Sequence, residues 1–288
     1  MMRRNAIIMA AGMSSRLVPL SAERPKGLLE VKGEIVIERQ IRQLQMAGIS
    51  DITVIVGYKA ELFDYLKNKY SVDIVLNEDF ARYNNTSSLF RVIDRLKNTY
   101  ICSCDNYFPE NVFIGDPQES YYSALFAKGD TSEYCMTLSA DDYIRKVSVG
   151  GRNAWYMIGH VYFNEAFSQA FGRLLSQEYC KEETRLGYWE DVFIRYIDIL
   201  PRMRVHRYKD GEIFEFDSLD ELRKLDTSYV NDSRSTIIKS IAAQLDCKEA
   251  ELHTFIRIKS NSDLLVFSFQ KNGEQYVYDE RLAVAIKQ

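Results

Sequence analysis

Hydrophobic and polar positions in the first hundred residues alternate between two periods. Short, continuously apolar runs, typical of strands buried on both faces of a parallel sheet, are separated by stretches with helical spacing. The expected strands are 6–10, 51–56, 72–76 and 99–104, and the expected helices are 35–46, 60–70 and 87–96. This order predicts a doubly wound, Rossmann-like α/β domain that binds its ligands at the carboxyl ends of the strands.

The pattern changes after Ser120. Short strand-like runs occupy 121–126, 134–139, 143–149 and 154–163, and two helical stretches follow them. We interpret this region as a sheet extension or a small lid over the same crevice. The central sheet is therefore expected to be mixed and mostly parallel.

The last part of the chain has a pattern of its own. After a polar stretch, a short amphipathic helix at 235–245 precedes strand-like runs at 264–269 and 274–280, which the turn 271–274 joins. The sequence thus predicts a main domain over residues 1–230 and a small α+β appendage over residues 231–288.

Composition limits the possible partners. The net charge of −4 gives no basic excess for nucleic acid, and no apolar run reaches the roughly 18 residues of a membrane span. The five cysteines are odd in number and scattered, which fits a reducing compartment, so we expect a cytoplasmic protein. A homodimer is compatible with the sequence, which does not fix the oligomeric state.

The loop after the first strand carries the most informative chemistry. Small residues at 10–12 leave backbone N–H groups accessible to a phosphate, and Ser14 and Ser15 add hydroxyl donors. Arg16 and Lys26 add two permanent positive charges. The dinucleotide fingerprint G-x-G-x-x-G and the Walker A motif are both absent from this loop. An ordinary connection with exposed charges is the alternative, but a long ordered loop is usually functional.

Several stretches together resemble a known family. The run MAAGMSSRLVPLSAERPKGLLEV at 9–31 is similar to the signature of nucleotidyltransferases, with Ser14 in place of its second glycine. RYNNTSSLF, YICSCDNYF, GYWEDVF and IFEFDSLDELRKL extend the resemblance to bacterial CTP:phosphocholine cytidylyltransferases. The likeness covers about residues 4–228.

The resemblance implies a reaction in which an acceptor phosphate attacks the α-phosphate of CTP and releases pyrophosphate. Lys26 and Arg16 would be the catalytic cations, because charge builds on the phosphoryl oxygens. The residues expected to bind the nucleotide are Ala10, Ala11, Gly12, Met13, Ser14, Ser15, Asn84, Asn85 and Ser88.

The family also implies a Mg²⁺ ion bound by carboxylates. Asp105 is the expected ligand at a strand end, although it could instead cap the following turn. Glu190 is the expected second ligand, and Asp191 beside it is an almost equal candidate. Ser103 stands where the family often has an acid. Asp217 is interpreted as part of a helix N-terminus.

The acceptor is expected to be phosphocholine or a related amino-alcohol phosphate or phosphonate. Quaternary ammonium groups bind to aromatic faces set at right angles, often near a carboxylate. Tyr134, Tyr188 and Trp189 are the candidates for such a cage, with Tyr122 and Trp155 in reserve. The alternative is that these rings belong to the core, as most of the nineteen tyrosines must.

Two other functions compete with this hypothesis. A sugar-1-phosphate nucleotidyltransferase would use the same loop, but RYNNTSSL and YWED follow the choline-type pattern. A non-catalytic nucleotide-binding regulator is suggested only by Ser14 and Ser103. The appendage weakly resembles the start of a choline-kinase-like amino-terminal lobe, in which SNSD at 260–263 replaces the expected nucleotide loop.

Overall fold

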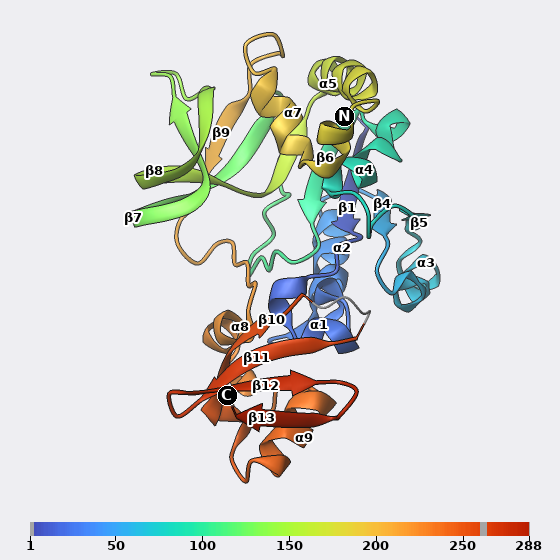
Figure 1. Cartoon of the computed structure of the whole chain (residues 1–288). Coiled ribbons are helices and arrows are strands. Elements are labelled where there is room, and N and C mark those ends of the chain that lie inside the picture. Colours follow the sequence, from blue (N-terminus) through green and yellow to red (C-terminus); the bar gives the residue numbers. More distant parts are fainter. Residues whose placement is uncertain (1–2, 260–263, 288) are drawn as a thin grey trace. The chain divides into compact units, whose positions relative to one another are not determined.

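The computed structural model describes residues 3–259 and 264–287, so the SNSD stretch lies outside the described residues. These residues form two compact units (Figure 1). Unit 1 comprises Met1–Gly12 and Glu38–Ile213, and unit 2 comprises Met13–Ile37 and Phe214–Gln288. The expected boundary at residue 230 marks where the resemblance ends, and the compact units divide the chain elsewhere. The chain passes from one unit to the other within the signature loop.

Unit 1 is built on a seven-stranded sheet with the order β5-β4-β1-β6-β8-β7-β9. Its strands are β1 (Arg4–Ala10), β4 (Asp51–Val56), β5 (Asp73–Leu76), β6 (Asn98–Ser103), β7 (Tyr121–Leu138), β8 (Ile144–Phe163) and β9 (Arg204–Arg207). The neighbours β5, β4, β1 and β6 run parallel, whereas β8 is antiparallel to both β6 and β7. The predicted doubly wound fold with a mixed, mostly parallel sheet is confirmed.

Helices lie beside the parallel strands of unit 1 (Figure 1). They are α2 (Val36–Met46), which begins in unit 2, η3 (Ala60–Phe63), α3 (Tyr65–Tyr70), α4 (Asn85–Phe90), η4 (Ile93–Arg95), α5 (Glu165–Glu178), α6 (Glu182–Leu186) and α7 (Trp189–Arg195). Phe163 of β8, Phe167 and Phe171 of α5 and Trp189 of α7 pack together as an aromatic group within the core. This packing fixes α7 against the sheet.

The region after residue 120 differs from the expected four short strands. β7 and β8 pair as two long antiparallel strands whose register shifts at several bulges, for example between Ala127 and Asp130. The bulges interrupt the alternation of apolar and polar residues, so each long strand reads as two short ones in the sequence. The expected helix at 87–96 likewise consists of α4 and η4, separated by a break.

Unit 2 combines an early segment of the chain with its end. The early segment forms η1 (Ser15–Leu17), α1 (Leu20–Glu23), η2 (Lys26–Leu28), β2 (Glu30–Val31) and β3 (Glu34–Ile35). The later segment forms α8 (Leu219–Leu225), η5 (Thr227–Tyr229), α9 (Thr236–Gln244) and η6 (Glu249–Glu251), followed by the strands β10 (Leu252–Arg257), β11 (Val266–Lys271), β12 (Glu274–Asp279) and β13 (Val284–Lys287). These four strands pair in sequence order as an antiparallel sheet, so the small α+β appendage is confirmed.

Across residues 3–259 and 264–287, each helix is too short or too polar to cross a membrane.

The turn after β4 requires a glycine. A Cβ atom at Gly57 would lie 2.6 Å from Cβ of Phe80 and 2.9 Å from the carbonyl oxygen of Ala11. We expect Gly57→Ala to lower the free energy of unfolding by about 1–3 kcal/mol, because overpacking displaces side chains and backbone. Urea denaturation measures this loss. In the control Gly12→Ala, the added Cβ meets nothing within 4 Å, so its stability should change by less than about 1 kcal/mol. Equal losses in the two variants would contradict this explanation.

Candidate functional site

Lys26 is a buried cation in unit 2. It opens η2 directly after Pro25, and only 3% of the residue is exposed. Its Nζ atom lies 2.9 Å from Oδ1 of Asp217 and 5.1 Å from the centre of the Phe216 ring. A buried ammonium is costly without a carboxylate and hydrogen bonds. Asp217 is therefore a main reason why this lysine can be buried.

Arg16 pairs with the other oxygen of the same carboxylate. Its Nη1 atom lies 2.9 Å from Oδ2 of Asp217, and its side chain is 76% exposed. Lys26 and Arg16, the two predicted catalytic cations, are thus brought together by one acid within unit 2. An exposed guanidinium is free to exchange Asp217 for a phosphate, whereas the buried ammonium is already in a fixed place.

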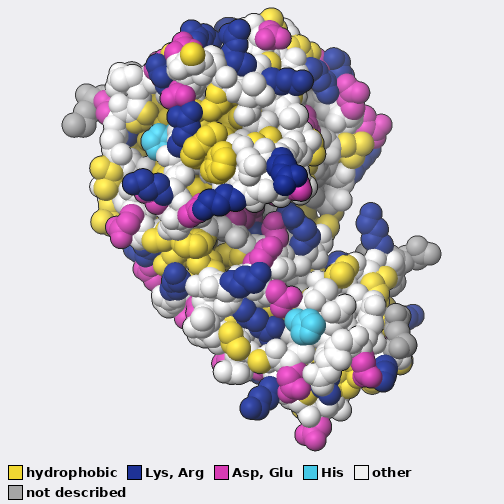
Figure 2. Space-filling model, turned by 90° about the vertical axis from the view of Figure 1, so that its left-hand side faces the viewer, with side chains coloured by type: hydrophobic (Ala, Val, Ile, Leu, Met, Phe, Trp, Pro, Cys, Tyr) yellow, Lys and Arg dark blue, Asp and Glu magenta, His cyan; other side chains and the backbone are white. Residues whose placement is uncertain are grey.

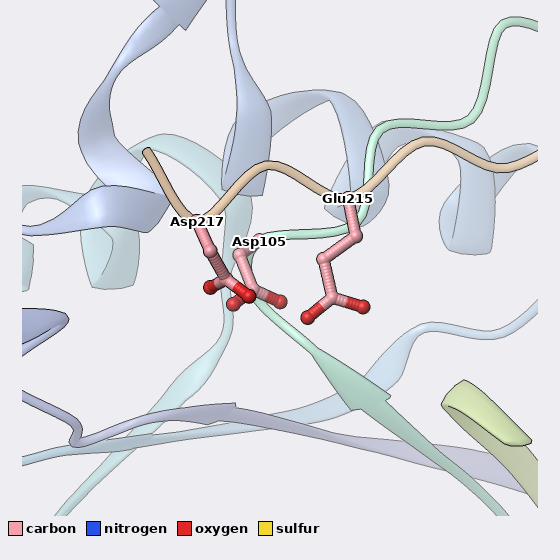
Figure 3. Close-up of side chains that lie close together, drawn as sticks. All are labelled: Asp105, Glu215 and Asp217. Carbon is pink, nitrogen blue, oxygen red and sulfur yellow. The ribbon is translucent and has the colours of Figure 1, made fainter. Parts of the chain in front are cut away.

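The start of α8 positions Asp217. Ser218 is the N-cap residue, and its hydroxyl accepts the backbone N–H of Glu221. The Glu221 carboxylate in turn accepts the N–H of Asp217 at 2.6 Å. The prediction that this stretch begins a helix was right, but the capping is done by Ser218, which leaves the Asp217 carboxylate for the two cations. Glu215 and Asp217 point to the same side of their segment (Figure 3).

The signature loop leaves β1 as its small residues suggest. Ala10 and Ala11 are buried, Gly12 and Met13 are exposed, and the carbonyl of Ala11 accepts the N–H of Tyr58 at 3.1 Å. Ser14 has φ 49°, in the left-handed region that favours glycine. This conformation explains why the family signature has a glycine at the position that Ser14 occupies.

Asp105 lies on the turn after β6 (Figure 3). The hydroxyl of Ser103 donates to its Oδ1 at 2.5 Å. Nε2 of Gln40, on α2, donates to the carbonyl groups of Ser103 and Asn106 at 2.7 Å each and so fixes the turn. Ser103, which replaces an acid of the family pattern, thus orients the Asp105 carboxylate. No sequence pattern points to Gln40, because its role depends on how α2 packs against this turn.

Glu190 lies on α7 and faces neutral partners. Its carboxylate accepts a hydrogen bond from Nδ2 of Asn85 at 3.3 Å and one from the hydroxyl of Tyr122 at 3.2 Å. Burial raises the pKa of this carboxyl to about 7, and the nearby Asp191 also raises it. Among the residues that the structure describes, Glu190 belongs to no group of three or more acidic, histidine or cysteine side chains that could share an ion. Its expected role as a metal ligand stays a prediction.

The polar residues of α4 link this helix to the rest of unit 1. Asn84 caps the helix, and its N–H donates to the carbonyl of Arg185 at 3.0 Å. Asn85 accepts the N–H of Trp189 at 2.9 Å, and Ser88 accepts a hydrogen bond from Asn77 at 2.9 Å. These contacts are structural. The predicted role of Asn84, Asn85 and Ser88 in nucleotide binding is not tested by them.

Two of the three predicted cage residues lie together. The rings of Tyr134 and Tyr188 are nearly perpendicular, at 81°, with their centres 6.5 Å apart. Asp191 accepts the Tyr134 hydroxyl at 3.0 Å and the backbone N–H of Tyr188 at 2.8 Å. Burial and the Asp191 carboxylate raise the pKa of Tyr134, so this hydroxyl stays protonated. Two perpendicular rings beside a carboxylate fit an organic cation.

Trp189 occupies a different environment. It is 3% exposed, and the rings of Phe163 and Phe171 meet it edge to face at 5.7 and 5.8 Å. Tyr122 stacks on it at 6.0 Å. The structure thus places Trp189 in the hydrophobic core, where its ring holds α7 in position. Tyr188, by contrast, is 46% exposed.

A cavity of about 650 Å³ opens elsewhere in unit 1. Its lining includes Tyr100, Tyr121 and Tyr208 and none of the predicted site residues. Figure 2 views the side of the molecule that carries β7, β8 and β9, where hydrophobic side chains gather in patches between arginines and lysines.

Comparison with known proteins finds relatives that are nucleotidyltransferases. Residues 6–140 match the MobA-like NTP transferase domain. The chain is 32% identical over 231 residues to a choline-phosphate cytidylyltransferase of Streptococcus pneumoniae, covering 79% of this chain and 99% of that protein. It is 34% identical to a 2-aminoethylphosphonate cytidylyltransferase of Lancefieldella rimae, over 78% of this chain and 93% of the relative.

A solved structure supports the same grouping. That structure, of a CTP:phosphocholine cytidylyltransferase from Streptococcus pneumoniae, matches with a TM-score of 0.76 and 33% identity. The match covers 79% of this chain and 99% of the other.

The raised pKa of Glu190 predicts a pH effect on stability in the metal-free protein. Between the ordinary value of 4.5 and about 7, the folded state keeps a proton that the unfolded state has lost. The contribution of this group to the free energy of unfolding therefore falls as the pH rises through this range. We expect Glu190→Gln to remove this fall, so its advantage over the wild type should be about 2 kcal/mol greater at pH ~8 than at pH ~5.

Urea denaturation in EDTA at both pH values measures this effect. Glu133→Gln, at an exposed acid of β7, is the matched control. An equal difference between Glu190→Gln and the wild type at both pH values would show that the buried carboxyl does not carry the effect.

Proposed function

Because the chain belongs to the nucleotidyltransferase family that includes the choline-phosphate and 2-aminoethylphosphonate cytidylyltransferases, we propose that it transfers CMP from CTP to phosphocholine or a closely related amino-alcohol phosphate or phosphonate. The products are the CDP-linked alcohol, or its phosphonate equivalent, and pyrophosphate. The observation that carries this proposal is the pair of perpendicular tyrosines beside Asp191, a feature suited to an alkylammonium group.

Lys26 and Arg16 are proposed to stabilise the phosphates. An acceptor phosphate is already a nucleophile, so the reaction needs cations for the charge that develops on the α-phosphoryl and pyrophosphate oxygens rather than a general base. Lys26 would hold the α-phosphate and the incoming phosphate, and Arg16 would hold the β- and γ-phosphates together with the backbone of 11–15. The phosphates then compete with Asp217 for both cations.

Nucleotidyltransferases generally work with a divalent metal, and the donor chemistry here fits Mg²⁺. Asp105 offers a carboxylate that Ser103 already orients, and hard oxygen ligands are those that Mg²⁺ prefers. Glu215 and Asp217 are two further carboxylates that point to one side of their own segment. Glu190 of α7 is the other predicted ligand, and its carboxylate accepts hydrogen bonds from Asn85 and Tyr122. The ion would neutralise phosphate charge when bound.

The acceptor's ammonium group is proposed to lie between Tyr134 and Tyr188. Their faces offer cation–π attraction, and Asp191 adds a negative charge nearby. A trimethylammonium group makes no N–H hydrogen bonds and depends on the rings, whereas a primary amine would also use the carboxylate. Trp189 would act indirectly, by holding the helix that carries Tyr188 and Asp191.

Pyrophosphate release tests the proposal. Each of the four NTPs is assayed with Mg²⁺ against phosphocholine, phosphoethanolamine, 2-aminoethylphosphonate and glucose-1-phosphate. We expect turnover with CTP and an amine-bearing acceptor. Preference for glucose-1-phosphate would indicate a sugar nucleotidyltransferase instead, and nucleotide binding without turnover would indicate a regulator.

Replacing the buried cation tests the catalytic assignment. Lys26→Ala should lower kcat at least about a hundredfold, because the contact strengthens as charge builds in the transition state. Steady-state kinetics with saturating Mg²⁺ measure this loss, and Lys146→Ala at an exposed lysine is the control. If only KM rises while kcat stays within a few-fold, Lys26 binds the substrate without a catalytic role.

Replacing Tyr188 and replacing the adjacent Trp189 should have different effects, one on acceptor binding and the other on stability. Tyr188→Ala removes an exposed cage face, so we expect phosphocholine affinity to fall about five- to thirtyfold, with CTP affinity nearly unchanged. Trp189→Ala empties a core site and should instead lower the free energy of unfolding by about 3–5 kcal/mol. Isothermal titration and thermal unfolding distinguish the two effects. Equal loss of affinity for phosphocholine, phosphoethanolamine and CTP in Tyr188→Ala would contradict the cage.

A further inference from the structure

The C-terminal appendage is tied to the signature segment at two points on either side of Lys26. Both ties lie within unit 2. One joins Thr236 to Glu23, and the other joins Arg234 to Glu30. The resemblance to cytidylyltransferases ends near residue 228, so Arg234 and Thr236 belong to the part of the chain beyond it.

The first tie caps a helix. Thr236 is the first residue of α9, and its backbone N–H donates to Oε1 of Glu23 at 2.8 Å while its hydroxyl donates to the same oxygen. The first N–H groups of a helix have no partner inside the helix. A carboxylate at this end accepts their hydrogen bonds and also interacts favourably with the positive end of the helix dipole. Glu23 is the last residue of α1, so this contact fixes the chain three residues before Lys26.

The second tie holds the chain four residues after Lys26. Nη1 of Arg234 donates to the carbonyl of Glu30 at 2.8 Å, and the Tyr229 hydroxyl donates to the same carbonyl at 2.8 Å. The guanidinium also stacks on the Tyr229 ring, 4.5 Å from its centre. Arg234 is set for this contact in a left-handed conformation, with φ 61°. Such a strained arginine needs compensating contacts.

A third contact is made to the short helix that contains the other predicted cation. The edge strand β10 runs beside η1, which contains Arg16. β10 bulges at Thr254, whose N–H donates to Oδ2 of Asp220 on α8 at 2.8 Å. The appendage therefore contacts the signature segment beside Arg16 and on both sides of Lys26.

We propose that residues 231–288 position the catalytic cations, with Arg234 and Thr236 as positioning residues that act through Lys26. This inference rests on the proposed function only for its kinetic consequence. The two ties fix the backbone at Glu23 and Glu30, and they thereby limit where the Lys26 ammonium can lie. The appendage is then a part of the transferase rather than an independent module.

The test compares the full-length wild type with the double variant Glu23→Ala/Arg234→Met. Arg281→Met is the matched control, because Arg281 pairs with Asp279 inside the appendage. In the ligand-free protein, hydrogen exchange of peptides within 20–32 should accelerate at least about fivefold in the double variant, because lost hydrogen bonds lower the opening free energy. The control should exchange like the wild type.

Kinetics then test the positioning role. With CTP and the preferred acceptor, kcat per folded enzyme should fall about tenfold in the double variant, and Arg234→Lys, which keeps a donor for Glu30, should stay within about twofold of the wild type. In a Lys26→Ala background the double change should alter the residual rate less than about twofold, because the cation to be positioned is gone.

Unchanged exchange at 20–32 would overturn the proposal, as would faster exchange with an unchanged kcat. An equal loss of rate with and without Lys26 would also overturn it, since the appendage would then act on folding alone. If the wild type turns over no NTP with any acceptor, the proposed function fails. The exchange measurement alone then decides whether the two ties hold the segment around Lys26.

Discussion

The buried ammonium group of Lys26 needs a carboxylate partner, and several contacts of unit 2 hold that carboxylate and the lysine in place. Lys26 is almost fully enclosed, and Asp217 lies 2.9 Å from it. The capping box of α8 holds the Asp217 backbone, and Pro25 fixes the entry to η2. Because desolvation of an ammonium costs several kcal/mol, this pairing keeps the cation charged and in place before any phosphate arrives.

Unit 1 contains carboxylate and aromatic groups that suit positively charged ligands, in contrast to the two cationic side chains of unit 2. The parallel strand β6 ends in the turn that carries Asp105, and the antiparallel extension carries Tyr134 close to Tyr188 and Asp191 of the α7 region. Oxygen ligands and aromatic faces suit a metal ion and an organic cation, whereas the two cations of unit 2 suit phosphates. The chain passes from one unit to the other between Gly12 and Met13, within the signature loop.

The sequence predicted the parallel core well because strands buried on both faces are continuously apolar, as 6–10 shows. It predicted β7 and β8 as fragments, since bulges disrupt the period of two. At the site, Lys26 and Asp105 were predicted from motif register, and their roles stay predictions. The pairing of Asp217 with the cations was missed, because a local capping pattern explained that acid equally well. The burial of Trp189 depends on how α7 packs against α5, which no local pattern contains.

Asp217 compensates the burial of the Lys26 ammonium, and a double-mutant cycle in urea measures this compensation. The variants are Lys26→Met, Asp217→Ala and their combination, all without nucleotide. Asp217→Ala alone should lower the free energy of unfolding by about 1–3 kcal/mol, because the buried charge loses a partner. Adding Lys26→Met should restore part of that loss, since it removes the charge itself. A double variant whose loss equals the sum of the two single losses would show that Asp217 does not compensate the buried ammonium.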